Sequence, residues 1–349
     1  MNQSICTNTQ RAARTLRTTL PALPAGLPFS VTAPCKINLH LLVGKKRDDD
    51  FHGLESIVAA LDFADTLTFS VLPGNGAETS LVVEDAGPLK ELALKGQIFP
   101  PIQTEKNLVY RAVELFRSKT GFSANLAIKL IKRIPPGSGL GGGSSDAAAT
   151  LLALNDLAGR NCPAELDRPD QRTKLSGEAL LDLAAQLGSD IPFFIGVALG
   201  STGKTPAWAV SGRGEVLQPL PPPPPLGVLL AFPGFASYTG AAYSLMDEAR
   251  PFTEKRIEKA GMNGSWPPPE NWDFTNDFLD LFLSHGTGQE KSSYRTVLES
   301  LKNAGAAFTG LSGSGSACFG IFSCPGEAEA AKKKLAGSFY TLQNTFFLA

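Results

Sequence analysis

The sequence is organised around the run Pro135-Pro136-Gly137-Ser138-Gly139-Leu140-Gly141-Gly142-Gly143-Ser144-Ser145-Asp146, in which five of the twelve residues are glycine. The apolar, basic-flanked residues 127–134 before it are typical of a strand, and the Ala- and Leu-rich residues 147–154 after it are typical of a helix. Glycine lets the backbone approach a ligand closely, and the free N–H groups at a helix N-terminus favour an anion. A strand, a glycine loop and a helix N-terminus in this order therefore predict a phosphate-binding loop.

This run also has two other interpretations. A flexible Gly/Ser linker is not favoured, because linkers seldom stand between a strand pattern and a helix pattern. A dinucleotide site is a sharper alternative, since Gly137, Gly139 and Gly142 satisfy G-x-G-x-x-G. That site needs an acidic residue at the end of the next strand, about 20 residues on, where residues 161–165 are loop-like. A dinucleotide-dependent oxidoreductase stays open as an alternative, whereas a Walker loop is excluded because no Gly-Lys-Ser/Thr follows.

The composition is that of a globular protein with a sizeable core. The 349 residues suffice for two domains or one large one, with 43% hydrophobic and 19% charged residues. A net charge of -1 gives no electrostatic case for nucleic acid or an anionic membrane. The five cysteines lack C-x-x-C spacing, which argues against a disulfide framework or a zinc site and favours the reducing cytoplasm.

Two segments indicate how the chain is divided. Residues 1–28 contain three arginines and no acidic residue, which is typical of an organelle transit peptide or of a disordered bacterial tail. A transit peptide would send the protein to a plastid. The five consecutive prolines of residues 221–225 predict a stiff polyproline II spacer, and we place a domain boundary there.

Several polar residues have ordinary structural explanations when each is taken alone. The alternating residues 35–43 predict a half-buried strand whose face with Lys36, Asn38 and His40 is best interpreted as solvated. Asp190 follows a predicted helix and is best interpreted locally as a turn or N-cap residue.

A second Gly/Ser cluster occupies residues 310–316, near the end of the chain. Packed beside the first glycine run, it would thicken the backbone cradle for a phosphate. This juxtaposition is a hypothesis.

Three separated segments, residues 33–39, 135–147 and 311–317, resemble the three motifs of the GHMP kinases in the same order. The resemblance covers residues 29–349 and implies an α+β, two-domain fold with the active site in the cleft between the domains. It implies an ATP-binding domain like the second domain of ribosomal protein S5 at residues 29–220. A ferredoxin-like α/β domain would follow at residues 226–349.

Four further segments, residues 47–52, 61–67, 188–194 and 274–277, are similar to the branch of that superfamily that phosphorylates a cytidyl diphosphate sugar alcohol. This resemblance implies transfer of phosphate from ATP, with Mg²⁺, to the 2-hydroxyl of diphosphocytidyl methylerythritol in non-mevalonate isoprenoid precursor biosynthesis. Another small-molecule GHMP kinase is the alternative. The sequence assigns no Mg²⁺ ligands and leaves monomer and homodimer open.

The resemblance also implies a role for individual residues. Lys36 and Asp190 become the catalytic pair, with Asp190 accepting the proton of the attacking hydroxyl. The substrate would be held by Asn38, Phe51, His52, Thr239 and Tyr243, with the two aromatic rings on either side of the cytosine and His52 at its edge. The family more often has Tyr in place of Phe51 and Phe in place of Tyr243. The nucleotide would be held by Pro135, Pro136, Gly137, Ser138, Gly139, Leu140, Gly141, Gly142, Gly143, Ser144 and Ser145.

Overall fold

The computed structural model describes residues 28–348, except residues 75, 98, 100–101, 160–173, 201–204, 250–264 and 339. The predicted N-terminal extension therefore lies outside the described residues, apart from Pro28. Among the helices of the described part, none is long and apolar enough to cross a membrane.

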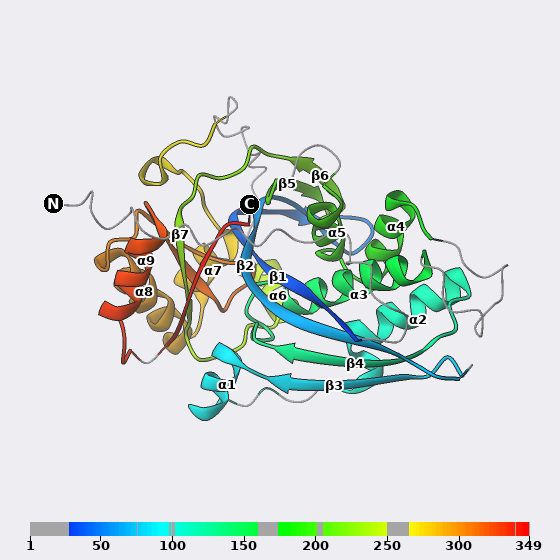
Figure 1. Ribbon diagram of the computed structural model, residues 1–349. Coiled ribbons are helices and arrows are strands. Elements are labelled where there is room, and N and C mark those ends of the chain that lie inside the picture. The colour runs from blue at the N-terminus through cyan, green and yellow to red at the C-terminus, as the bar shows by residue number, and fades with distance from the viewer. Residues whose placement is uncertain are drawn as a thin grey trace.

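A long antiparallel hairpin runs through the middle of the molecule (Figure 1). It consists of β1 (Phe29–Lys46) and β2 (His52–Leu72). On its other edge β2 pairs first with β5 and then with β4, so the sheet runs β3-β4-β2-β5-β6 with β1 on β2. The remaining strands of this sheet are β3 (Thr79–Asp85), β4 (Asn125–Lys132), β5 (Ala207–Gly212) and β6 (Val216–Pro219).

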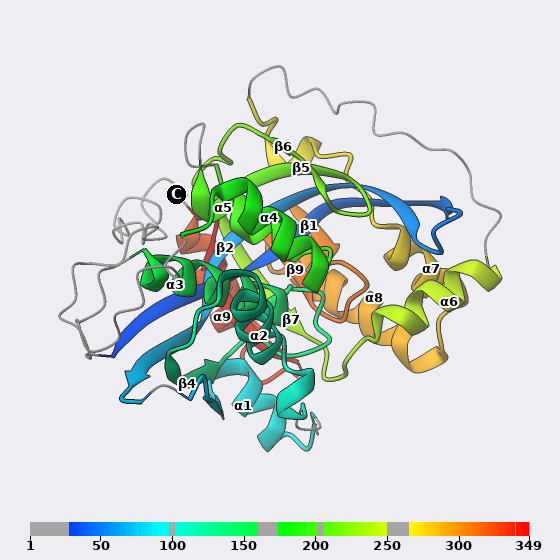
Figure 2. The same cartoon turned by 90° about the vertical axis from the view of Figure 1, so that its right-hand side faces the viewer.

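Four helices cover one face of this first sheet (Figure 2). They are α2 (Leu108–Thr120), α3 (Gly142–Ala158), α4 (Gly177–Leu187) and α5 (Ile191–Leu199). A short helix, α1 (Gly87–Leu94), follows β3. The helix α2 has clear end signals: Asn107 accepts a hydrogen bond from the Val109 N–H, and Gly121 closes the helix with a left-handed φ of 71°.

A second sheet of four antiparallel strands has the order β10-β7-β9-β8. Its strands are β7 (Gly227–Phe232), β8 (Phe308–Leu311), β9 (Cys318–Phe322) and β10 (Thr341–Phe346). The helices of this half are α6 (Thr239–Ala249), α7 (Asp277–His285), α8 (Gly288–Asn303) and α9 (Pro325–Lys334).

The apolar core forms three layers that meet at the hairpin. One cluster lies between the first sheet and α2–α5, and another packs the second sheet against its own helices. Between the two sheets lies a third cluster, in which Ile37 and Leu39 of β1 pack with Val228 and Leu230 of β7. Because β1 is covered on both faces, every residue from 33 to 43 is buried.

The prediction that this strand face is solvated is therefore wrong. Lys36, Asn38 and His40 are 5–8% exposed. Alternation identifies a strand and its period, but it does not say what covers the polar face. Here that face lies under α3 and the glycine run rather than in water.

Most predicted elements are confirmed, with several corrections. The helix after the glycine run begins at Gly142 rather than after Asp146. Gly141 is therefore the N-cap residue, and Gly142 and Gly143 belong to the helix. Residues 196–205 are mostly small or polar in sequence, as is typical of an insertion, but α5 continues to Leu199 and makes the first four of them helical. Cys35 and Cys318 are free and buried.

The proline run 221–225 joins β6 of the first sheet to β7 of the second. The proposed division into residues 29–220 and 226–349 follows this change of sheet. It stays a prediction, because the apolar layer between the sheets contains residues from both sides of the boundary.

Candidate active site

Two glycine loops from distant parts of the chain pack against each other. The first glycine loop is residues 135–141 and the second is residues 312–317. The N–H groups of Ser316 and Ala317 donate to the carbonyls of Gly137 and Ser138 at 3.1 and 3.0 Å. The Ser312 hydroxyl donates to the carbonyl of Gly139 at 2.9 Å. The hypothesised juxtaposition of the two clusters is confirmed.

The contact between the loops depends on the absence of a side chain at Gly139. A Cβ atom built there would lie 2.0 Å from the carbonyl oxygen of Ser312, and Gly139 has a left-handed φ of 73°. Neither condition admits an L-residue without movement of the backbone.

We expect Gly139→Ala to destabilise the fold by roughly 2–6 kcal/mol, the sum of left-handed strain and overpacking at ~1–3 kcal/mol each. Gly143→Ala is the matched control, since a Cβ there meets only Leu108 Cδ1 at 3.6 Å and the residue is helical. That change should be neutral or stabilise the helix by up to ~1 kcal/mol. Urea unfolding measures both, and equal free energies of unfolding for the two variants would contradict the expectation.

Lys36 lies where the first glycine loop meets α3. Its backbone N–H donates to the Leu140 carbonyl at 3.0 Å, and a Cβ built on Gly141 would lie 3.2 Å from Lys36 Cγ. The ammonium donates to Asn38 Oδ1 and lies 3.6 Å from Asp190 Oδ2. The structure thus brings the two predicted catalytic residues together from β1 and from the start of α5.

Asp190 occupies the N-cap position of α5 but does not cap the helix with its side chain. Its side chain is 49% exposed, whereas that of Lys36 is 6% exposed. The carboxylate therefore keeps oxygen lone pairs free for another partner. The local interpretation as an N-cap residue is right about the position and wrong about the hydrogen bond.

Asn38 connects Lys36 to the second glycine loop. Its amide donates to the Ser56 hydroxyl at 2.8 Å, and Ser56 donates to the His40 carbonyl at 2.6 Å. Its backbone N–H donates to the Ser312 hydroxyl at 3.3 Å. Sequence reasoning did not select Ser56 or Ser312, although Ser312 lies within the third motif.

His40 turns away from this network toward the second half of the protein. Its Nδ1 accepts a hydrogen bond from the Thr275 N–H at 2.9 Å, which places the ring proton of the neutral form on Nε2. Burial lowers the pKa of His40 below its usual value, against the charge of Asp277. The imidazole is therefore a structural tie between β1 and the segment before α7.

The predicted substrate-binding residues include Phe51 directly before β2, His52 at its start and Tyr243 on α6. The His52 ring stacks on Tyr243, with ring centroids 5.0 Å apart. Its Nδ1 lies 3.0 Å from the Gly44 carbonyl oxygen and its Nε2 lies 3.2 Å from Asp247 Oδ1. Phe51 is 56% exposed, and the Arg213 guanidinium lies 5.2 Å from its ring centroid.

Tyr243 and Thr239 connect α6 to the catalytic side. Burial, and then the negative charge of Asp190, raise the pKa of the Tyr243 phenol to about 12. The Thr239 hydroxyl lies 3.2 Å from the Ser314 hydroxyl of the second glycine loop. The N-terminal half of α6 therefore borders both the second glycine loop and Asp190.

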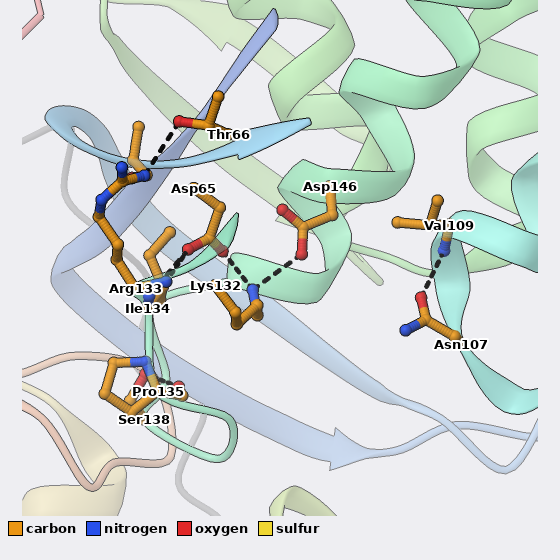
Figure 3. A network of polar contacts seen from close by, with 11 residues as sticks. Asp65, Thr66, Asn107, Val109, Lys132, Arg133, Ile134, Pro135, Ser138 and Asp146 are labelled. Atoms are coloured by element: carbon orange, nitrogen blue, oxygen red, sulfur yellow. Dashed lines mark hydrogen bonds and ion pairs between the residues drawn. The ribbon is translucent and has the colours of Figure 1, made fainter. Parts of the chain in front are cut away.

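A buried cluster of charges, which sequence reasoning missed, lies behind the first glycine loop (Figure 3). Asp65 of β2 and Asp146 of α3 both accept hydrogen bonds from Lys132 at the end of β4. Burial raises the pKa of Asp146 to about 7, opposed by Lys132 and reinforced by Asp65. The available signal was a pair of acids, Asp65 within a strand and Asp146 directly after the glycine run.

The chain is similar to known protein families and to named relatives. Residues 107–196 match the GHMP kinases N terminal domain, and residues 260–341 match the GHMP kinases C terminal domain. The 4-diphosphocytidyl-2-C-methyl-D-erythritol kinase of Anaeromyxobacter dehalogenans (strain 2CP-1) is 34% identical over 308 residues, 87% of this chain and 84% of that protein. The protein of the same name from Thermodesulfovibrio yellowstonii is 34% identical over 306 residues, 86% of this chain and 92% of that protein.

A solved structure agrees with these relatives. The crystal structure of a 4-(cytidine 5'-diphospho)-2C-methyl-D-erythritol kinase is 29% identical and superposes with a TM-score of 0.65, over 92% of this chain and 100% of that chain. The paired glycine loops and the two sheets are thus those of the GHMP kinase class, and the predicted α+β fold is confirmed. Within that class, the chain belongs to the family of 4-diphosphocytidyl-2-C-methyl-D-erythritol kinases.

The dinucleotide alternative is not favoured. A dinucleotide-binding loop leaves the centre of a parallel, doubly wound sheet. Here the strand before the loop, β4, pairs antiparallel with β2 and parallel with β3. Residues 161–165, where the acidic residue of such a site was sought, lie outside the described residues.

Proposed function

We propose that this protein transfers the γ-phosphoryl group of ATP to the 2-hydroxyl of 4-diphosphocytidyl-2-C-methyl-D-erythritol, in the non-mevalonate route to isoprenoid precursors. The observation that carries the proposal is the Lys36–Asp190 contact of 3.6 Å, which lies where the first glycine loop enters α3. The names of relatives at 34% identity over most of the chain supply the substrate. The proposed location is the cytoplasm, or a plastid if residues 1–28 direct it there.

The first glycine loop and α3 would hold the nucleotide phosphates. The carbonyls of residues 137–140 are taken by donors from the second loop, from Ser237 and from Lys36. The negative ends of these peptide groups are thus satisfied inside the protein. The N-terminus of α3 begins at Gly142, where free N–H groups and the helix dipole favour an anion.

Lys36 and Asp190 would perform the chemistry between the phosphate and the acceptor. The half-exposed carboxylate of Asp190 is suited to accept the proton of an attacking hydroxyl. The buried ammonium of Lys36 would orient that carboxylate and stabilise the charge that develops on the transferred phosphoryl group. Asn38 holds Lys36 from the side and would keep its ammonium aimed at the cleft.

Phe51 and Tyr243 would stack on the cytosine, with ~1–3 kcal/mol per stacked base, and His52 would contact its edge. In the structure Arg213 covers Phe51 and His52 covers Tyr243. Binding of the base between the two aromatic residues would therefore displace these internal partners. Thr239 would contact the polar end of the substrate from the start of α6.

The family's use of ATP implies Mg²⁺. This ion prefers few protein ligands, usually one or two carboxylates, and is completed by phosphate oxygens and water. Among the described residues no group of three or more His, Cys, Asp or Glu side chains is placed to hold a metal ion, so Mg²⁺ would be held mainly by phosphate oxygens and water. Bound Mg²⁺ would neutralise charge on the phosphates, while the side chains of this protein orient the acceptor and remove its proton.

The test is a coupled assay of ADP release with ATP, Mg²⁺ and 4-diphosphocytidyl-2-C-methyl-D-erythritol. We expect turnover that saturates in both substrates, and a product in which the 2-hydroxyl carries the new phosphate by ³¹P NMR. Mevalonate and homoserine serve as matched alternative acceptors. Turnover with either of them, and none with the cytidyl substrate, would assign the chain to another branch of the GHMP kinases.

A further inference from the structure

Asp65 holds the chain where it leaves the first sheet to enter the first glycine loop. Its carboxylate is fully buried and accepts hydrogen bonds from the Lys132 ammonium and from the backbone N–H groups of Arg133 and Ile134. Arg133 adds a bond from its guanidinium to the Thr66 hydroxyl at 2.9 Å. The last residues before Pro135 are therefore fixed to β2.

Lys132 connects this fixed segment to the other end of the first glycine loop. Its ammonium donates to Asp146 at 2.8 Å, in the first turns of α3. A Cβ built on Gly142 would lie 2.9 Å from Lys132 Nζ and 2.8 Å from Ile134 Cγ2. The entry strand and the helix N-terminus thus touch directly, and the cluster of Asp65, Lys132 and Asp146 joins the two ends of the loop (Figure 3).

A buried cluster of this kind is not expected to increase the folding stability of the protein by itself. The side chains of Asp65, Lys132 and Asp146 are 0%, 11% and 3% exposed, and two carboxylates share one ammonium. Asp146 Oδ1 is buried without a hydrogen-bond partner in the structure. Apolar side chains of similar volume often stabilise a buried site as well as or better than an ion pair. The need to hold the two ends of the first glycine loop in a fixed geometry explains the cluster better than a gain in folding stability does.

We propose that Asp65, Lys132 and Asp146 are positioning residues for the nucleotide, which set the separation of the two ends of the first glycine loop. This proposal rests on the proposed kinase function. None of the three residues needs to touch ATP. They determine where the N–H groups of the loop and of α3 point, and an error of ~1 Å in such positions can cost up to ~10²-fold in rate or affinity.

The sharpest test is the double variant Lys132→Met/Asp146→Leu. It removes the link between β4 and α3, while Asp65 keeps its two backbone donors. We expect this variant to fold with a lower melting temperature, because the buried Asp65 carboxylate loses its ammonium partner and keeps only its two backbone donors. We also expect the dissociation constant for the non-hydrolysable analogue AMP-PNP with Mg²⁺ to rise roughly 10- to 100-fold.

Kinetics separate positioning from catalysis. KM for ATP should rise by a similar factor, whereas kcat at saturating ATP and KM for the cytidyl substrate should stay within about threefold of the original values. Lys132→Arg keeps the charge and should recover part of the affinity. Lys129→Met on the same strand removes a half-exposed ion pair with Glu84 and serves as the control with unchanged nucleotide binding.

The outcomes are distinguishable. A folded double variant that binds AMP-PNP as tightly as the original protein overturns the proposal, and so does an equal loss in kcat with no change in nucleotide affinity. If the double variant does not fold, the single variant Asp146→Asn, which keeps the shape of the side chain, takes its place under the same criteria. Because AMP-PNP binding needs no acceptor, failure of turnover with the cytidyl substrate would reject the proposed function and leave this test intact.

Discussion

Replacing Asp190 by Asn is expected to lower kcat by about 10²–10⁴-fold, the contribution typical of a positioned general base. The amide has nearly the shape of the carboxylate but cannot accept the proton of the acceptor hydroxyl. Nucleotide affinity should change little, since the loop and α3 do not depend on this side chain. Initial rates of ADP release at saturating substrates, together with AMP-PNP titration, measure both quantities.

Asp182→Asn is the matched control for this change. Asp182 is an exposed acid on the neighbouring helix α4, and its replacement should leave kcat unaltered. Because the Asp190 side chain is half exposed and does not cap α5, the melting temperature of Asp190→Asn should stay near that of the original protein. Full turnover by Asp190→Asn would mean that another group accepts the proton.

Replacing Lys36 by Met is expected to lower kcat by about 10²–10³-fold, as the loss of one preorganised electrostatic contact to a transition state does. Met retains most of the buried hydrocarbon stem, so packing beside Gly141 should persist. Asn38 and Asp190 would both lose their partner at the cleft. Single-turnover rates of phosphoryl transfer measure this effect separately from product release.

The double variant Lys36→Met/Asp190→Asn tests whether the two residues act as one unit. Groups that cooperate in one step are strongly non-additive, so the double variant should be little slower than the slower single variant. Lys36→Arg should keep the charge but misplace it, and should recover only part of kcat. Additive losses in the double variant would show that Lys36 and Asp190 act at separate steps.

Local patterns in the sequence were sufficient to predict most of the elements around the site. The strand before the first glycine loop and the helix after it each carry their own period, and α2 carries its Asn107 cap and Gly121 end. The start of α3 was misplaced because glycine is a weak helix former. The helix nevertheless begins at Gly142. Position 142 is glycine because Lys132 and Ile134 leave no room there for a side chain.

Elements whose stability comes from neighbours were harder to predict. The strand β10, with the polar sequence Thr-Leu-Gln-Asn-Thr-Phe, forms because β7 offers it an edge. The helix α1 is short and lies in a region rich in loop residues. For β10, tertiary context outweighs local preference.

The chemistry of the site depends on contacts that no local pattern contains. Lys132 and Asp65 are 67 residues apart, and Asn38 and Ser312 are 274 residues apart. Lys36 and Asp190 each had a plausible structural explanation, and only the resemblance to a family joined them. The roles of the residues that would hold the cytosine stay predictions, and in the structure the ring of Tyr243 stacks on that of His52.

The contact between the two glycine loops has a consequence for modularity. The first loop belongs to the half of the chain before the proline run, yet its carbonyls are satisfied by N–H and hydroxyl groups of residues 312–317. A fragment that ends at residue 220 would keep the whole phosphate-binding motif and lose the backbone that shapes it. The predicted phosphate site thus depends on residues from both halves of the chain, and we expect neither half to bind ATP when it is expressed alone.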